Sequence, residues 1–377
     1  MSNKISIITL HTSTNYGSCL QAYATEKIFA SIGWDPEIID YWRKVNLLSY
    51  QVDSICESFM GGRAHKLFRY LPPLDWFFRQ IVIKKIKKID APFEHFRKRY
   101  LKLSEKKYEN YLSLKEDFPK ADVYCTGSDQ VWNSEWNNGF DDAMFLSFVP
   151  DEKKKISFSS SIGKSELNSS ERKKFHDALL RYDSISLRET SAVKIIQSLG
   201  FNDVVQVLDP TLLLKREDWE NIAKKVEGVP KQYILVYNLN KNKDFDSFVK
   251  KTSKEMNLPV VSICHRPNFK QKHSINFVLP EVTQFLYLFL NADFVITDSF
   301  HGTAFSVNFE IPFYSFSPGK YSSRLKDFLK NIELSERYIQ STMSDKNLIF
   351  EIDFTLPKLI LKQKRVETIN YLKTALE

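Results

Sequence analysis

The sequence predicts an α/β protein with two Rossmann-like domains that face each other across a cleft. Short apolar segments alternate with helical patterns, which is typical of parallel sheets covered by helices on both faces. The alternation occurs in two series, separated by a segment at 211–231 that we interpret as a crossing between domains. At 377 residues, the chain is also long for a single hydrophobic core.

The first series lies in residues 1–210 and defines the expected N-terminal domain. It predicts strands at 5–10, 36–41, 121–127, 155–163, 184–189 and 203–210. It predicts helices at about 19–31, 171–182 and 190–200. The polar turn HTSTNYGS separates the first strand from its helix. Residues at about 45–118 interrupt the alternation, and we expect them to form an insertion.

The second series lies in residues 211–355 and defines the expected C-terminal domain. It predicts strands at 232–239, 258–265, 292–298 and 311–316. Helices are expected between the first two of these strands, at 281–290, and after His301. A closing helix at 356–377 follows and could pack back on the first domain.

Composition limits the class of protein. The four cysteines are far apart and form no C-x-x-C pair, which argues against a zinc site or a disulfide framework. Only about six apolar residues precede the first polar turn, too few for a secretory signal, and the longest later apolar stretch is too short to cross a membrane. The chain contains no P-loop, G-x-G-x-x-G or H-E-x-x-H motif. We therefore expect a soluble cytoplasmic protein without a metal or a cofactor.

Most of the positive charge lies in the expected insertion. Between Arg63 and Lys107 there are 14 Lys and Arg against 4 Asp and Glu, a net charge of +10, while the whole chain carries +8. This segment could be a solvated helical face, a surface that meets anionic lipid headgroups or a lipid-diphosphate substrate, or a nucleic-acid site. No nucleic-acid motif accompanies it, so nucleic acid is not an expected partner. Bulky apolar residues interleave with the charges: Trp76, Phe77, Phe78, Ile81, Ile83, Ile86 and Ile89.

The stretch FVITDSFHGTAFS (294–306) places a histidine between a buried strand and the next helix. Ligands of doubly wound sheets bind beyond the carboxyl ends of the strands. Asp298 or Ser299 can cap the helix, and Gly302 could let an anionic ligand approach the free N–H groups at its start. His301 beside a bound anion could act as a general acid. The alternative is a loop histidine that only hydrogen-bonds the backbone.

Arg188 ends the predicted strand SISLRE and is the second candidate for binding an anion. An arginine at this position can hold a carboxylate or a phosphate through its two-pronged guanidinium. A structural ion pair with Glu189 or Asp183 is the alternative. Lys320 and Arg324, in GKYSSRLKDFL, could face the same cleft.

Six segments in this order resemble the polysaccharide pyruvyl transferase family: TSTNYGSCLQAYA, GSDQVWN, KISFSSSIG, SLRE, VLDPTLLL and TDSFHGTAFS. The resemblance covers nearly the whole chain except the basic insertion and the last residues. It implies a GT-B-like arrangement of the domains and phosphoenolpyruvate as donor. It also implies transfer to two hydroxyls of a sugar in a surface or capsular polysaccharide precursor, which gives a pyruvate ketal. Many members carry an arginine two residues before the histidine, where this chain has Ser299.

The resemblance also implies roles for the candidate residues. His301 would be the acid and Arg188 its catalytic partner, while Lys320 or Arg324 would replace the arginine absent at position 299. The expected donor site, on the C-terminal domain side, comprises Arg188, Arg324, Lys320, Ser299, Gly302 and Thr303. The expected acceptor site, on the N-terminal domain, comprises Asn15, Tyr16, Gly17, Gln21, Ser128, Asp129, Gln130 and Trp132.

Within that acceptor site, the ring of Trp132 could stack on a sugar. Alternatively, the two segments that supply most of the site, TNYGS (14–18) and GSDQVWN (127–133), could be structural turns. Asp129 and Asp298 are candidates for the general base. The chemistry implied by the family requires neither a metal nor a nucleotide cofactor.

Two other functions remain open from the sequence. One is a GT-B-type glycosyltransferase that uses a nucleotide-sugar, and the other is a glycan-binding relative without catalytic activity. The acceptor could be linked to a nucleotide or to a polyprenyl diphosphate. In the latter case the protein would work at the inner face of the membrane, on an anionic surface.

Overall fold

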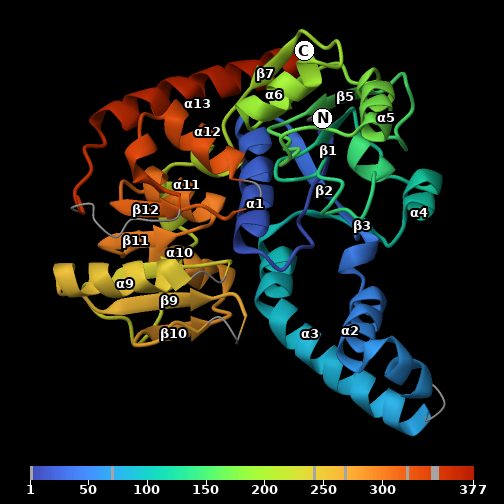
Figure 1. The fold of residues 1–377 in the computed structure, drawn as a ribbon. Coiled ribbons are helices and arrows are strands. Elements are labelled where there is room, and N and C mark those ends of the chain that lie inside the picture. The colour runs from blue at the N-terminus through green and yellow to red at the C-terminus, as the bar shows by residue number, and fades with distance from the viewer. Residues whose placement is uncertain (1–2, 69–71, 241–242, 267–269, 320–321, 341–347) are drawn as a thin grey trace.

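Two parallel β-sheets, each covered by helices, form the two domains of the protein (Figure 1). The computed structural model describes residues 3–68, 72–240, 243–266, 270–319, 322–340 and 348–377. Most strands of both sheets are short and apolar, and helices form most of the crossovers between them, the pattern that the alternation in the sequence predicts.

The first sheet has the strand order β3-β2-β1-β4-β5, with every neighbouring pair parallel. A further parallel pair, β6-β7, continues it, because Ser157 donates its N–H to the carbonyl of Ser184 at 2.9 Å. The strands are β1 (Lys4–Ile8), β2 (Asp35–Tyr41), β3 (Leu103–Tyr108), β4 (Val123–Thr126), β5 (Lys154–Ser157), β6 (Ile185–Leu187) and β7 (Val204–Gln206).

The second sheet has the order β10-β9-β8-β11-β12-β13 and is also parallel throughout. Its central strands are buried along their whole length, which explains their continuous apolar sequence. The strands are β8 (Ile234–Tyr237), β9 (Val260–Cys264), β10 (Ile275–Val278), β11 (Phe294–Thr297), β12 (Phe313–Phe316) and β13 (Tyr338–Ile339).

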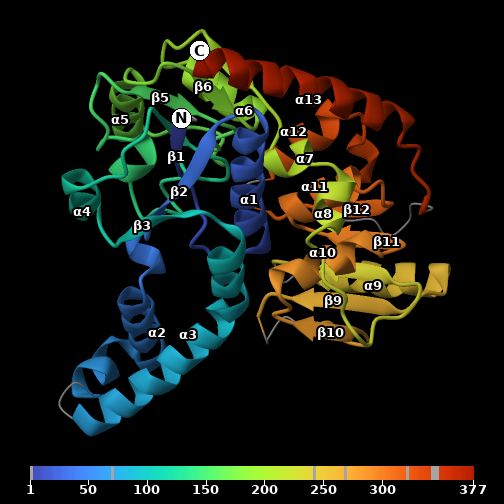
Figure 2. The same cartoon turned by 180° about the vertical axis from the view of Figure 1, so that it is seen from behind.

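The helices cover both sheets and connect the domains (Figures 1 and 2). They are α1 (Tyr16–Ser31), α2 (Leu48–Phe68), α3 (Pro72–Tyr100), α4 (Tyr111–Glu116), α5 (Ser169–Leu179), α6 (Thr190–Gln197), α7 (Pro210–Leu213), α8 (Arg216–Glu220), α9 (Lys243–Met256), α10 (Val282–Leu290), α11 (Phe300–Asn308), α12 (Ser323–Asn331) and α13 (Thr355–Leu376). The last helix, α13, runs back to the first domain, where the hydroxyl of Tyr371 donates to the carbonyl of Ser157 at 3.2 Å.

Helix α1 begins three residues earlier than the sequence pattern suggests. The side chain of Asn15 accepts a hydrogen bond from the N–H of Ser18 at 3.3 Å and caps the helix. Tyr16 and Gly17 therefore belong to its first turn and not to a loop. This brings the start of α1 against the second domain, since the hydroxyl of Tyr16 donates to the carbonyl of Pro280 at 2.8 Å.

The segment expected as an insertion at 45–118 divides into three parts. Helices α2 and α3 pack as a hairpin that projects from the body of the molecule (Figures 1 and 2). Strand β3 belongs to the first sheet as its edge strand, and the short helix α4 follows it. The sequence pattern missed β3, β10 and β13 because they are short or partly exposed edge strands without an apolar run.

The α2–α3 hairpin is attached firmly at its base. Phe93 and Phe96, near the end of α3, lie in the main hydrophobic core, and the ring of Phe93 is 4.9 Å from that of Tyr16. Among the described residues, every helix is too short or too polar to span a bilayer.

Candidate active site

A cleft of about 720 Å³ lies between the two domains, at the carboxyl ends of their strands. From the first domain its walls come from the loops after β1, β2 and β4 and from the start of α1. From the second domain they come from the loops after β8, β9 and β11 and from α12. Its polar and charged side chains include Asn15, Ser18, Arg43, Asn46, Asp129, Gln130, Asn240, His265, Arg266, Asp298, Ser299, His301 and Arg324.

His301 lies in the first turn of α11 and lines this cleft. Its side chain is only 8% exposed, because its ring packs against the backbone of Gly17 in the other domain. A Cβ atom added to Gly17 would lie 2.0 Å from Nδ1 of His301. Nε2 of the ring faces Oδ2 of Asp209 at 3.6 Å, an ion-pair contact that is too long for a hydrogen bond.

Asp209 is the buried centre of the site. It caps α7 through Oδ1, which accepts from the N–H of Thr211 at 2.9 Å and from its hydroxyl at 2.6 Å. Oδ2 accepts from Nη1 of Arg188 at 2.7 Å and from the hydroxyl of Ser128 at 3.3 Å. Burial would raise the pKa of Asp209, but His301, Arg188 and these hydrogen bonds hold it well below its ordinary value. Its carboxylate therefore stays ionised between the histidine and the arginine.

The sequence pattern did not single out Asp209, although the same strand-end argument applies to it. The residue lies in VLDP, just after β7, and the following proline begins α7. Asp before Pro at the carboxyl end of a strand is a helix-capping pattern. The pattern therefore indicates a cap at Asp209 and gives no sign that the residue belongs to the site. Arg43 and Arg266 follow β2 and β9 in the same way, and both line the cleft.

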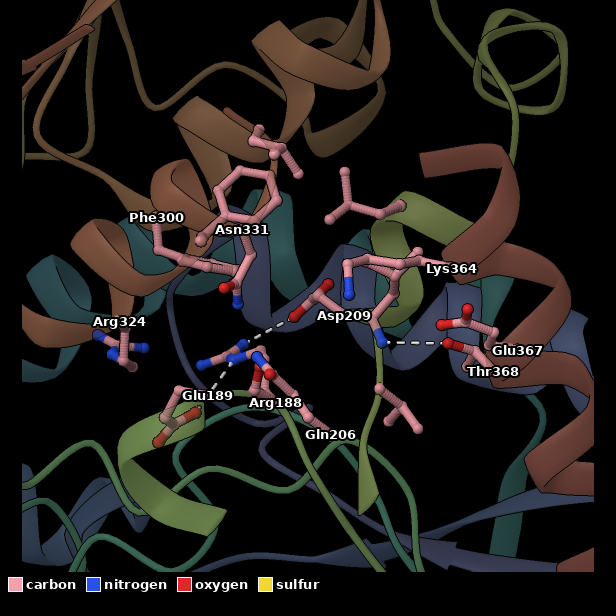
Figure 3. Close-up of a pocket in the computed structure, with 15 residues that line it drawn as sticks. Arg188, Glu189, Gln206, Asp209, Phe300, Arg324, Asn331, Lys364, Glu367 and Thr368 are labelled. Atoms are coloured by element: carbon pink, nitrogen blue, oxygen red, sulfur yellow. Dashed lines mark hydrogen bonds and ion pairs between the residues drawn. The ribbon is translucent and has the colours of Figure 1, made fainter. Parts of the chain in front are cut away.

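Arg188 is held by carboxylates and is not open to the main cleft. Besides the bond to Asp209, its Nη2 lies 3.5 Å from Oδ1 of Asp129, and its Nε lies 3.9 Å from Oε2 of Glu189. Figure 3 shows the guanidinium between Asp209 and Glu189. Burial would lower the pKa of Arg188, but Asp209 and Asp129 raise it. The main ionic partner is therefore Asp209, which the sequence did not suggest, and not Asp183.

The guanidinium of Arg188 faces a small cavity of about 30 Å³, shown in Figure 3, which shares Phe300 and Arg324 with the lining of the cleft. This volume has room for water but not for a phosphate ester. The Nε and Nη2 atoms of Arg188 have no hydrogen-bond partner among the described residues. Its carbon Cζ lies 4.5 Å from the centre of the Phe300 ring, a cation–π contact.

Arg324, on α12, lines both the cleft and the small cavity. Its Cζ lies 5.9 Å from the same Phe300 ring. Burial and the neighbouring charge of Arg188 lower its pKa to about 10, so the guanidinium is still charged at neutral pH. Its Nε has no hydrogen-bond partner within the described part of the chain. The other candidate for this role, Lys320, lies outside the described residues.

Three other residues expected at the donor site have structural contacts. Ser299 lines the cleft but caps α11, because its hydroxyl accepts from the N–H of Gly302 at 3.3 Å. A Cβ atom on Gly302 would lie 2.5 Å from Oγ1 of Thr297, so this glycine makes room for β11 and not for a ligand. Thr303 is buried, and its hydroxyl donates to the carbonyl of Ser299 at 3.0 Å.

Asp298, a candidate base, holds the loop after β8. Its Oδ1 accepts from the N–H of Leu239 at 2.7 Å, and its Oδ2 accepts from the N–H of Asn240 at 2.9 Å. Burial raises its pKa above the ordinary value, against the effect of these hydrogen bonds. These contacts give Asp298 a structural role.

On the first domain, three of the expected acceptor residues, Tyr16, Gln21 and Trp132, make their contacts inside the fold and do not line the cleft. Tyr16 stacks on Phe285 of the second domain, with ring centres 4.6 Å apart. Gln21 donates to the hydroxyl of Thr9 and to the carbonyl of Ser18, both at 2.9 Å.

Trp132 is also buried: it stacks on Phe145 with ring centres 5.3 Å apart, and its Nε1 donates to the carbonyl of Met144 at 3.0 Å. The expected stacking of Trp132 on a sugar is therefore wrong. Trp136, four residues later, lines the cleft and is 54% exposed.

The remaining acceptor candidates lie at or near the cleft. Asn15 caps α1, and Gln130 accepts from Nδ2 of Asn133 at 2.8 Å. Asp129 accepts from the hydroxyl of Ser18 at 2.6 Å. Burial would raise the pKa of Asp129, but Arg188 and His301 lower it. Ser128 is fully buried, and its hydroxyl donates to Asp209.

These contacts join segments that lie far apart in the sequence. Most of the chain, including these segments, matches one family. The family model for polysaccharide pyruvyl transferase matches residues 15–320. The chain belongs to the polysaccharide pyruvyl transferase family. The matched range includes Gly17, Arg188, Asp209 and His301, and it ends before Arg324. As a member of the polysaccharide pyruvyl transferase family the protein is a transferase, and the resemblance in its six segments is confirmed.

A solved structure agrees with the fold of this pyruvyl transferase family member. UDP-GlcNAc 2-epimerase of Methanocaldococcus jannaschii, in complex with UDP-GlcNAc and UDP, has a TM-score of 0.50 and 14% identity, over 97% of this chain and 92% of that chain. E. coli heptosyltransferase WaaC with ADP has a TM-score of 0.38 and 9% identity, over 89% and 98%. At these identities the likeness concerns only the fold. Two Rossmann-like domains in a GT-B arrangement are confirmed. A search of curated proteins finds no significant match.

The buried ion pair predicts how stability depends on pH. Replacing Asp209 with Asn leaves Arg188 without its closest carboxylate and should cost about 3 kcal/mol at pH 7. The pKa of Asp209 is depressed in the folded state, so its contribution is present above the unfolded pKa of about 4. It is lost as the pH falls further. Denaturant unfolding should therefore show the difference from wild type shrinking below about pH 4. Exposed Asp203→Asn is the control, and a difference that is constant with pH would contradict the prediction.

Proposed function

We propose that this protein transfers the pyruvyl group of phosphoenolpyruvate to two hydroxyls of a sugar, forming a pyruvate ketal and releasing phosphate. The acceptor would be a precursor of a surface or capsular polysaccharide. The observation that carries this proposal is that His301 and Arg324 line one cleft, where Nε2 of His301 lies 3.6 Å from Oδ2 of the buried Asp209, which is itself bonded to Arg188. An acid and the arginines that line the same cleft, Arg324, Arg43 and Arg266, suit a donor with two anionic groups.

The charges around Phe300 favour an anion in the cleft. Arg188 and Arg324 both approach this ring, and their mutual repulsion lowers the pKa of Arg324. An anion bound beside Arg324 would offset that repulsion. Arg43 and Arg266 on the opposite walls add positive charge. Phosphoenolpyruvate, with a carboxylate and a phosphate, needs at least two such groups.

We assign His301 as the general acid. It gives a proton to the methylene carbon of phosphoenolpyruvate, which leaves an oxocarbenium-like centre at C2. One sugar hydroxyl adds there, and its proton returns to His301. Phosphate then departs with the electrons of its C–O bond, and the second hydroxyl closes the ketal while its proton leaves with the phosphate. Asp209 orients the ring because its Oδ2 lies 3.6 Å from Nε2.

In this arrangement Arg188 acts indirectly. Its guanidinium pairs with Asp209 and Asp129 and lines the small cavity, not the main cleft. Arg324 is the arginine that can contact the donor directly, and it replaces the one that many relatives carry at position 299. Trp136 lies at the cleft with 54% of its surface exposed and is the aromatic side chain we assign to the sugar.

Arg324→Ala should raise the KM for phosphoenolpyruvate by about tenfold or more, because one charged hydrogen-bonding partner of the donor is lost. Arg324→Lys should recover part of the loss, since it restores the charge without the planar fork. Arg188→Ala should lower both kcat/KM and stability, because it leaves two buried carboxylates unpaired. The measurements are steady-state kinetics and denaturant unfolding.

Arg172→Ala is the matched control for these variants, since Arg172 donates to Ser198 at an exposed position of the first domain. An unchanged KM in Arg324→Ala would exclude Arg324 as the donor contact. Ser299→Arg in the Arg324→Ala background tests the replacement idea, because it restores the arginine of many relatives. Recovery of activity would support it.

The reaction itself is tested with phosphoenolpyruvate labelled in the pyruvyl carbons, a panel of nucleotide-linked and lipid-linked sugars, and detection of released phosphate. Label in a ketal on the sugar, with one phosphate released for each ketal formed, is the expected result. Transfer of a sugar from a UDP-sugar, without incorporation of label, would instead identify a GT-B-type glycosyltransferase. Glycan binding without either reaction would identify a non-catalytic relative.

A further inference from the structure

The α2–α3 hairpin carries an exposed face that the reaction does not use. Its inner side is closed by Val52 and Cys56 of α2, which are buried with Val82 of α3. Side chains near the end farthest from the body point outward instead. Four of them on α3 are apolar and between 50 and 63% exposed: Leu74, Trp76, Phe77 and Ile81.

A band of lysines follows these apolar residues along α3, toward the body of the molecule. Lys84, Lys85, Lys87 and Lys88 are all exposed. At 100° per residue, Lys84 and Lys88 lie on the same outward face as Phe77 and Ile81. Other basic side chains of α3 are paired with carboxylates, such as Arg79 with Asp53 and Asp75, and Arg97 with Asp90. Within the described residues, none of the four lysines has such a partner.

The segment of α3 that carries the lysine band lies beside the end of α2 that is next to the cleft. Val52 and Cys56 pack in one cluster with Val82, Ile83 and Ile86, so the first turns of α2 lie beside the segment that carries the lysines. Gln51, next to Val52, lines the cleft, as do Arg43 and Asn46 just before α2. The segment of α3 that carries the lysines and the end of α2 next to the cleft therefore lie at the same level of the hairpin.

We propose that the α2–α3 hairpin docks on an anionic phospholipid bilayer. The apolar end of α3 enters the boundary between headgroups and acyl chains, and the four lysines contact the lipid phosphates. This order of apolar and then basic residues along one face matches the depth profile of a bilayer surface. It does not match nucleic acid, which would leave the exposed Trp76, Phe77 and Ile81 in water.

This inference rests on the hairpin alone and holds for any reaction at the cleft. If the proposed function is also correct, docking places the cleft beside acceptors that are linked to lipid.

Co-sedimentation with phosphatidylglycerol vesicles tests the proposal on the full-length protein. We expect binding at low salt that weakens as salt rises, and little binding to phosphatidylcholine vesicles. Changing Lys84, Lys85, Lys87 and Lys88 to Glu should reduce partitioning to the vesicles by at least about tenfold. The matched control changes Lys224, Lys225, Lys250 and Lys254 to Glu, which alters the net charge equally at exposed positions away from the hairpin, and it should still bind.

Insertion is tested separately through Trp76. Its fluorescence should shift to the blue and be quenched by brominated acyl chains, and Trp76→Phe should remove this response. No sedimentation of the wild type at low salt, or equal losses in both lysine variants, would overturn the proposal. So would a dimer in solution that depends on Phe77 and Ile81 without vesicle binding, because the face would then join two copies of the chain.

Discussion

His301→Ala is expected to lower kcat at least about 100-fold, because the variant lacks the group that we propose as the acid that protonates the donor. His301 is the histidine of the cleft that lies within contact distance of a buried carboxylate, with Nε2 at 3.6 Å from Asp209. The measurement is the rate of phosphate release at saturating phosphoenolpyruvate and acceptor. A KM for the donor that changes less than kcat would place the loss in the chemical step.

The control for this variant is His265→Ala on the other wall of the same cleft. Burial and the neighbouring Arg266 lower the pKa of His265 to about 4, so it is neutral at pH 7 and unsuited to give a proton. We expect His265→Ala to keep most of kcat. Because His301 is buried and not an exposed loop residue, thermal unfolding of His301→Ala and His301→Gln must show an intact fold. Equal kcat in folded His301→Ala would exclude its role as the acid.

Gly17→Ala is expected to lower kcat by about 100-fold although Gly17 is not the acid. The added methyl group would lie 2.0 Å from Nδ1 of His301, so the imidazole must move. A displacement of about 1 Å in a catalytic group can cost two orders of magnitude in rate. Alanine is otherwise favoured over glycine inside a helix, so α1 itself should tolerate the change. Steady-state kinetics and far-UV circular dichroism give the two measurements.

A double-mutant cycle separates this effect from general damage. If Gly17→Ala acts by moving His301, it should have almost no further effect on kcat in the His301→Ala background, because the group that it displaces is already gone. Equal losses in both backgrounds would show that Gly17→Ala acts elsewhere, for example on the packing of the two domains.

Much of this site follows from position along the chain. His301 and Arg188 each follow a short buried strand, and parallel strands bring their carboxyl ends to one edge of a sheet. That local rule was enough to select both residues. It also applies to Asp209, Arg43 and Arg266, which the sequence pattern did not single out; for Asp209 the helix-capping pattern offered a structural explanation.

Burial was the property that the sequence could not decide. Trp132 and Trp136 lie four residues apart in one polar loop. The residues around them give no reason to assign one rather than the other to the sugar. In the structure Trp132 packs on Phe145, while Trp136 lies at the cleft. Likewise, Gly302 makes room for Thr297, whereas Gly17 makes room for His301. Each difference depends on which neighbour the fold supplies.

The sequence alone determined the fold class, the family and the basic, apolar character of α3, because periodicity, strand-end motifs and charge are properties of local segments. The tertiary structure decided how those segments meet. Gly17 contacts His301 because α1 docks on the second domain through Tyr16 and Phe285. Asp209 meets His301 because α7 packs against α11, where Nδ2 of Asn308 donates to the carbonyls of Thr211 and Leu214. The hairpin exposes Trp76 and Phe77 because one side of α3 is already covered by α2. Contacts between distant segments depend on packing across the whole molecule, and no local pattern encodes them.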